Sequence, residues 1–149
     1  MFRTKASTYA ILAVAEIAKR QVDGAGGVQA GEIARCLELP AAYAAKVLTQ
    51  LARAGILRSD RGPRGGFRLL RPVESIVLLD IIEAVDGTIV AETGLGASQG
   101  EGNVAHGTLR GLDDIYDRIV EQVRASLRRT NIASLVEQPE TVSTFVPVP

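Results

Sequence analysis

Residues 30–70 read AGEIARCLELPAAYAAKVLTQLARAGILRSDRGPRGGFRLL, and this stretch decides the fold. Apolar side chains recur at helical spacing over 30–37 and again over 40–54, and Pro40 stands between the two segments. Proline suits the first turn of a helix but ends a preceding one, because it lacks an amide hydrogen and restricts the residue before it. Two helices joined by so tight a break are typical of a helix-turn-helix.

A β-hairpin is predicted directly after the second helix. Two short apolar segments, 56–58 and 67–70, flank the glycine-rich stretch 59–66, which forms a mobile tip. A helix-turn-helix followed by such a hairpin is a winged helix. We expect the wing glycines to let the backbone approach a phosphate closely, and the wing arginines to reach phosphates or a minor groove.

The rest of the chain is mainly helical, so the predicted fold class is mainly α. A first helix is predicted over 7–20, with Ser7 or Thr8 as its N-cap. Further elements are a short helix over 77–85, a glycine-rich loop over 89–107, a long helix over about 108–129 and a frayed tail over 138–149. These boundaries predict a DNA-binding domain over 1–88 and a dimerisation helix within 108–137.

A wide apolar stripe marks the long helix. It comprises Leu109, Leu112, Tyr116, Ile119 and Val123, at alternating spacings of three and four. Because this helix is distant in sequence from the core, the stripe favours packing against a second copy of the chain. Packing against its own domain is the alternative.

The charges are unevenly distributed. The 17 Lys and Arg balance the 17 Asp and Glu, yet residues 1–72 hold 12 basic against 5 acidic side chains, a net of +7. Residues 73–149 hold 5 against 12, a net of −7. Such asymmetry is expected of a basic nucleic-acid-binding module joined to an acidic regulatory module, although chance segregation of solvated charge would look the same.

The single cysteine, Cys36, excludes an intramolecular disulfide and a cysteine-cluster metal site, which suits a reducing cytosol. We expect Cys36 to be a small buried apolar residue, with a reactive redox thiol as the alternative. No apolar run approaches the ~18 residues of a membrane span, so a cytoplasmic location is expected.

The chain resembles the Rrf-two family of winged-helix regulators, the group of the IscR and NsrR repressors. Residues 61–69, RGPRGGFRL, are similar to the family's wing signature RGPxGGxxL, and Lys5, Tyr9, Tyr43 and residues 83–87 support the match, which covers about 1–137. The resemblance implies a homodimer, joined through the long helix, that reads a two-fold symmetric operator in double-stranded DNA.

DNA contacts follow from this resemblance together with the positive charge of the wing. The expected contact residues are Lys5, Ala42, Tyr43, Ala45, Lys46, Arg58, Arg61, Gly62, Pro63, Arg64, Gly65, Gly66 and Arg68. Ala45 stands where a carboxylate often reads a base, and Lys46 where an amide often does, so the base preference is open. A lysine can pair with guanine or touch a phosphate.

Many family members hold an iron–sulfur cluster through three cysteines in the loop before the long helix. No cysteine lies between 91 and 107, where Asn103 replaces the last cysteine and His106 matches a histidine ligand of one member. One imidazole cannot substitute for the missing thiolates. We therefore expect a repressor without cofactor or metal, which responds to a small-molecule or protein effector or to oxidation of Cys36.

Two other classes of protein fit the sequence less well. The stretch 94–100 lacks the spacing, the helix context and the lysine of a nucleotide-binding glycine loop, so an enzyme is not expected. A winged-helix adaptor that binds proteins instead of DNA is the remaining alternative. The clustered arginines of the wing favour the DNA reader.

Overall fold

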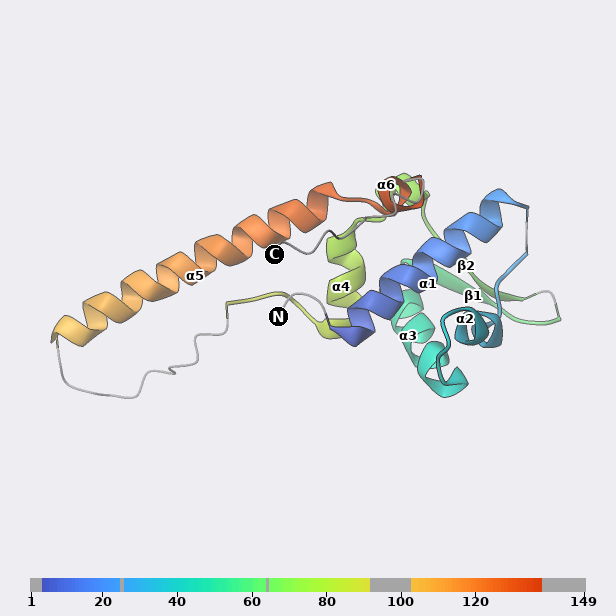
Figure 1. Ribbon diagram of the computed structural model, residues 1–149, viewed down its shortest axis with the longest axis horizontal. Coiled ribbons are helices and arrows are strands. Elements are labelled where there is room, and N and C mark those ends of the chain that lie inside the picture. The colour runs from blue at the N-terminus through green and yellow to red at the C-terminus, as the bar shows by residue number, and fades with distance from the viewer. Residues whose placement is uncertain (1–3, 25, 64, 92–102, 138–149) are drawn as a thin grey trace, which may run out of the picture.

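The computed structural model describes residues 4–24, 26–63, 65–91 and 103–137, apart from the side chains of 103–106 and 109. It comprises a helical domain with a two-stranded sheet, from which one long helix projects (Figure 1). The elements are α1 (Lys5–Val22), α2 (Ala30–Cys36), α3 (Ala41–Arg53), β1 (Leu57–Asp60), β2 (Gly66–Leu69), η1 (Val73–Ser75), α4 (Leu78–Asp86), α5 (Asn103–Arg129) and α6 (Ile132–Val136). The predicted mainly α winged-helix class is confirmed. Within these ranges no helix is both long and apolar enough to cross a membrane.

The first helix begins earlier than predicted, because Thr4 and not Ser7 or Thr8 is its N-cap. The Thr4 hydroxyl accepts a hydrogen bond from the Ser7 amide at 3.1 Å, and the Ser7 hydroxyl oxygen accepts one from the Thr4 amide at 2.9 Å. This reciprocal capping box satisfies amides that the first turn leaves free. Thr4 also donates to the Asp86 carboxylate at 2.7 Å, which ties the start of α1 to the end of α4.

The hydrophobic core lies around α1, with α3, α4 and α6 packed against it (Figure 1). Its largest fully buried aliphatic side chains come from five helices, from strand β1 and from the connecting segments: Val14, Ile17, Val28, Ile33, Leu48, Leu51, Ile56, Leu57, Ile76, Ile81 and Ile132. Burial of this apolar surface is the main stabilising contribution to such a fold. Arg20 lies at the edge of the core, where a hydrogen bond from its guanidinium to Glu16 raises the pKa of Arg20.

The C-terminal region, predicted as a dimerisation segment over 108–137 whose long helix spans about 108–129, contains two helices. Helix α5 begins at Asn103, within the stretch expected to be a loop, and ends at Arg129. Asn131 is extended and caps a separate α6, because its side chain accepts a hydrogen bond from the Ser134 amide at 2.9 Å. Ile132 is fully buried and donates its amide to Ile76 at 2.9 Å. Helix α6 therefore belongs to the core of the winged-helix domain, and the predicted tail over 138–149 lies outside the described residues.

The wing is a tightly packed hairpin. Strands β1 and β2 pair antiparallel, with Arg58 opposite Arg68 and Asp60 opposite Gly66. A short third segment joins β2, since Val28 and Phe67 exchange backbone hydrogen bonds of 2.9 and 2.8 Å.

Two of the wing glycines, Gly65 and Gly66, are buried against backbone. A Cβ on Gly65 would lie 2.2 Å from the Asp60 carbonyl oxygen, and one on Gly66 would lie 2.7 Å from the Val28 carbonyl oxygen. Gly66 also has a φ of 123°, which favours glycine. These positions are glycine because chain segments cross closely there, a role within the protein that requires no phosphate.

Candidate nucleic-acid interface

Helix α3 presents one buried face and one open face. Ala44, Val47, Leu48 and Leu51 are buried against the core. The opposite face forms a shallow hollow of about 380 Å³ lined by Ala42, Ala45, Lys46, Thr49, Gln50 and Arg53. The structure thus brings three predicted contact residues together on one surface. It adds Thr49, Gln50 and Arg53, which the periodicity of three and four from Ala42 and Lys46 could have indicated.

Tyr43, the fourth predicted residue of this helix, is only partly exposed and packs against the core. Its ring meets the ring of Tyr9 edge to face, with centroids 6.1 Å apart and planes at 83°. Aromatic pairs favour this geometry. Tyr43 therefore positions α3 on α1, in addition to any contact that it makes with DNA.

The arginines of the wing differ in their partners. Arg58 and Arg68, opposite each other across the hairpin, both approach the same carboxylate oxygen of Asp60, at 3.4 and 3.3 Å. Arg61 is exposed and forms no ion pair within the part of the chain that the structure describes. Gly62 and Pro63 beside it are exposed as well, and Arg64 lies outside the described residues.

Lys5 is exposed in the first turn of α1. Its amine is therefore free to meet solvent or a phosphate. The structure does not place it on the open face of α3, since Lys5 is not among the residues that line that hollow.

Cys36 is exposed, so the expectation of a buried thiol is wrong. It is the last residue of α2, and the core-facing positions of that short helix are taken by Ile33 and Ala34. No group of three or more His, Cys, Asp or Glu side chains that could hold a metal occurs among the described residues. Since the chain has one cysteine, its residues do not fit a cluster held by three thiolates.

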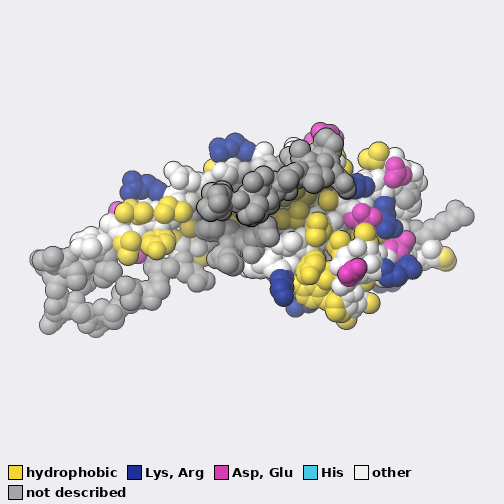
Figure 2. All heavy atoms as spheres, in the orientation of Figure 1, with side chains coloured by type: hydrophobic (Ala, Val, Ile, Leu, Met, Phe, Trp, Pro, Cys, Tyr) yellow, Lys and Arg dark blue, Asp and Glu magenta, His cyan; other side chains and the backbone are white. Residues whose placement is uncertain are grey.

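Helix α5 carries exposed apolar side chains along its projecting part, where Figure 2 shows them gathered into a patch. Leu112, Ile115, Tyr116 and Ile119 are each 44–53% exposed, although they are large hydrophobic residues. Val123 is partly buried, and the side chain of Leu109 lies outside the described part. Three of the five predicted dimerisation residues are thus open on one protomer.

The base of α5 is fixed to α4 by a small polar network. Arg124 donates a hydrogen bond to the carboxylate of Glu83 and another, of 3.0 Å, to the Ile89 carbonyl oxygen. The Ile89 amide donates to the same Glu83 oxygen at 3.0 Å. Because the Arg124 and Glu83 side chains are only 17% and 24% exposed, this pair is better shielded from water than the ion pairs of the wing.

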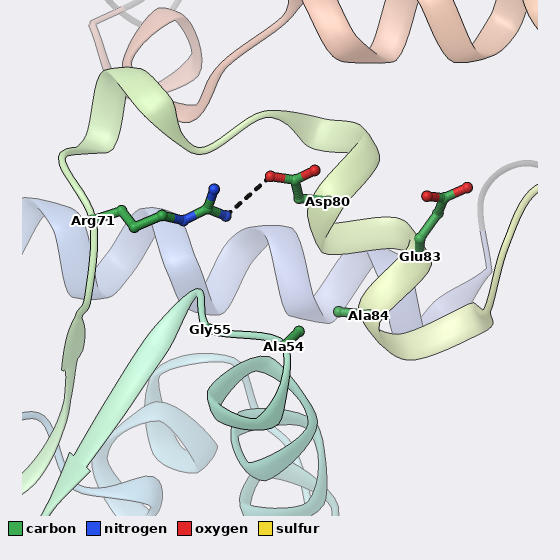
Figure 3. Close-up of a pocket in the computed structure, with 6 residues that line it drawn as sticks. All are labelled: Ala54, Gly55, Arg71, Asp80, Glu83 and Ala84. Carbon is green, nitrogen blue, oxygen red and sulfur yellow. Dashed lines mark hydrogen bonds and ion pairs between the residues drawn. The ribbon is translucent and has the colours of Figure 1, made fainter.

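Beside this network lies an open depression of about 530 Å³, between the end of α3 and α4 (Figure 3). Arg71 extends toward Asp80 and pairs with it at 3.0 Å, whereas the Glu83 carboxylate points away from Arg71 (Figure 3). The remaining lining residues are Ala54, Gly55 and Ala84. The Arg71–Asp80 ion pair and the Arg124 network engage the charged groups of the depression, whereas the Nε atom of Arg71 is buried without a hydrogen-bond partner.

A helix-turn-helix with its open reading face, a two-stranded arginine-bearing wing and a long projecting helix define a winged-helix DNA-binding protein. The family model described as "Rrf2: Iron-dependent Transcriptional regulator" matches residues 3–138. The chain belongs to the Rrf2 family, which confirms the resemblance seen in the sequence. Its members are transcriptional regulators, so the protein is a DNA-binding regulator and not an enzyme.

Relatives and solved structures agree with this assignment. The HTH-type transcriptional regulator IscR of Cereibacter sphaeroides is 31% identical over 131 residues, 87% of this chain and 83% of the relative. BadM of Rhodopseudomonas palustris is 32% identical over 139 residues, covering 93% and 81%. The structure of the oxidised form of Staphylococcus aureus CymR is similar with a TM-score of 0.69 at 26% identity, covering 95% of this chain and all of that one.

Proposed function

We propose that the protein is a cytoplasmic, sequence-specific transcriptional repressor that binds a two-fold symmetric operator as a homodimer, without an iron–sulfur cluster. The observation that carries the proposal is the open face of α3, where small Ala42 and Ala45 leave a hollow bordered by Lys46 and Arg53. This face belongs to the half of the chain whose net charge is +7. A basic, solvated helix face followed by an arginine-bearing wing suits the major groove and its flanking phosphates.

In this mechanism α3 enters the major groove while the wing contacts backbone or minor groove. Small alanines allow the helix to approach base edges closely, and an alanine can contact the methyl group of thymine. Lys46 pairs with guanine or holds a phosphate. Two copies related by a two-fold axis would read half-sites about one helical turn apart.

Dimerisation through α5 is supported by its exposed apolar side chains. Leu112, Tyr116 and Ile119 recur at spacings of three and four, which suits packing against the same stripe on a second helix. A contact of this kind is self-complementary, as a two-fold symmetric dimer requires.

The cluster-free state is supported by the ligand chemistry of the chain. Clusters of this kind need thiolates, and the only thiol belongs to Cys36 at the end of α2. The signal is then a small-molecule or protein effector. Thiol oxidation is the alternative that one observation favours, because Cys36 is exposed on the helix that precedes the reading helix. It fails if Cys36→Ser leaves the response of operator binding to peroxide or disulfide stress unchanged.

The decisive experiment is to sequence the genomic DNA fragments retained by the purified protein and then measure its affinity for them at several salt concentrations. A DNA reader should select a shared palindromic sequence, and its affinity should fall with a log–log slope of about −0.9 per phosphate contact. An adaptor should select no sequence and respond little to salt.

Single variants locate the contacts within the interface. Lys46→Ala should change base preference at one position of each half-site if Lys46 reads a base, whereas Arg61→Ala should weaken binding to all sequences. Lys19→Ala, which removes an exposed charge in the last turn of α1, is the matched control. It should leave the base preference and the overall affinity for DNA unchanged. Unaltered affinity in Arg61→Ala combined with Arg64→Ala would reject the role given to the wing.

A further inference from the structure

The outward face of the wing carries a carboxylate between two arginines. Alternation along β1 places Arg58 and Asp60 on the face opposite Leu57, which is buried in the core. Arg68 joins that face because it stands directly opposite Arg58 in the hairpin register. Both guanidinium groups reach the Oδ2 atom of Asp60, at 3.4 Å from Arg58 and 3.3 Å from Arg68.

These two ion pairs add little to the stability of the fold. The side chains of Arg58, Asp60 and Arg68 are 54%, 39% and 32% exposed, although the Nε atom of Arg68 is itself buried without a hydrogen bond, and ion pairs between side chains this exposed contribute little to folding. The hairpin is held instead by its backbone ladder and by Leu57, which is buried beneath it. The function of Asp60 is therefore to be sought in what the arginines bind.

We propose that Asp60 is an intramolecular competitor of DNA phosphates, which limits the affinity of the wing for duplex DNA. The inference rests on the proposed function. In the free protein the carboxylate occupies Arg58 and Arg68, and on approach to DNA it repels the phosphates that these arginines would otherwise meet. Because a surface ion pair exchanges readily, the arginines remain available once α3 has engaged its operator.

Asp60 would in this way limit the sequence-independent binding of the protein to DNA. Phosphate contacts supply essentially all of that binding, and each one releases counterions and steepens the dependence on salt. A regulator whose wing arginines were wholly free would spend more time on the large excess of non-operator DNA. Asp60 reduces that retention at the cost of some affinity for the operator.

The test uses Asp60→Asn, which keeps the shape of the side chain and removes its charge. Binding of the full chain to a duplex of arbitrary sequence should tighten by about two- to fivefold in ~0.1 M salt, which corresponds to the strength of one exposed ion pair. The log–log slope against salt should become steeper by about 0.9 for each arginine that gains a phosphate contact. Asp60→Glu retains the charge and should behave like the parent chain.

The matched control is Asp80→Asn. It also removes one negative charge and releases one arginine, because Asp80 pairs with Arg71 at 3.0 Å with similar exposure, but it lies on α4 and not on the wing. Equal tightening in both variants would assign the effect to overall charge and overturn the proposal. Unchanged or weaker binding by Asp60→Asn, at an unaltered unfolding midpoint, would also overturn it. If the parent chain itself shows no salt-sensitive binding to DNA, the proposed function fails as well.

Discussion

The close packing of the wing glycines leads to a prediction that separates two roles for Gly65. A methyl group added there would lie 2.2 Å from the carbonyl oxygen of Asp60 and 2.7 Å from the carbonyl carbon of Arg61. Real Cβ atoms do not approach backbone so closely, so Gly65→Ala must displace the turn that joins β1 and β2. That turn also receives the Gln29 side chain, whose amide donates to the Gly65 carbonyl oxygen at 2.9 Å.

The expected loss is that of an overpacked site, about 1–3 kcal/mol of unfolding free energy. For a chain of 149 residues this corresponds to a fall of about 2–12 °C in the unfolding midpoint. The control is Gly31→Ala in α2, where an added Cβ meets nothing within 4 Å. That change should stabilise the protein by about 0.5–1 kcal/mol, since alanine is the better helix former.

Thermal unfolding without DNA, at equal protein concentrations for all variants, distinguishes the two roles. If Gly65 serves packing, the midpoint of Gly65→Ala falls before any DNA is added. If it serves the approach of a phosphate, the midpoint is unchanged and only the affinity for DNA is reduced. A parent-like midpoint in Gly65→Ala would therefore refute the packing argument.

Three further predictions concern helix α5 and the segment α6 that follows it. Arg124→Ala removes the ion-pair partner of the shielded Glu83 carboxylate, which then keeps only the Ile89 amide, and should cost about 1–3 kcal/mol, measured by urea unfolding. Ile132→Ala should cost about 2–5 kcal/mol in the same assay, because Ile132 is fully buried; a cost below 1 kcal/mol would contradict the place given to α6 in the core. Leu112→Asp combined with Ile119→Asp should convert a dimer to a folded monomer in analytical ultracentrifugation, and a persisting dimer would exclude this face as the interface.

Much of the fold was predictable because its signals are local. Pro40 separates α2 from α3, and Gly55, with a φ of 73°, follows the C-cap of α3 where the helix was expected to end. The paired apolar segments around residues 59–66 predicted the hairpin for the same reason. Each of these features is decided by a few neighbouring residues.

The features that sequence reasoning missed depend on contacts between distant segments. Nothing in the local pattern indicates that Ile132 packs beneath α1, or that Gly65 lies against residues around Asp60. The exposure of Cys36 was also missed, because the helical period of a seven-residue element leaves its last position free to face either way. In the interface, the two alanines and Lys46 were identified by resemblance, whereas Gln50 was missed although its spacing of four from Lys46 places it on the same helix face.

After α5 the chain returns to the winged-helix domain, where α6 packs in its core, and this has a consequence for the orientation of α5. Arg124 lies before the last turn of α5 and Ile132 after it, and both contact the winged-helix domain. The C-terminal end of α5 is therefore fixed to that domain and not joined to it by a flexible linker. In a symmetric dimer, the side-chain packing inside each protomer would then determine the distance between the two α3 helices. A ligand or substitution that altered this joint by a few degrees would change the spacing of operator that the pair can span, without touching a single base-contacting residue.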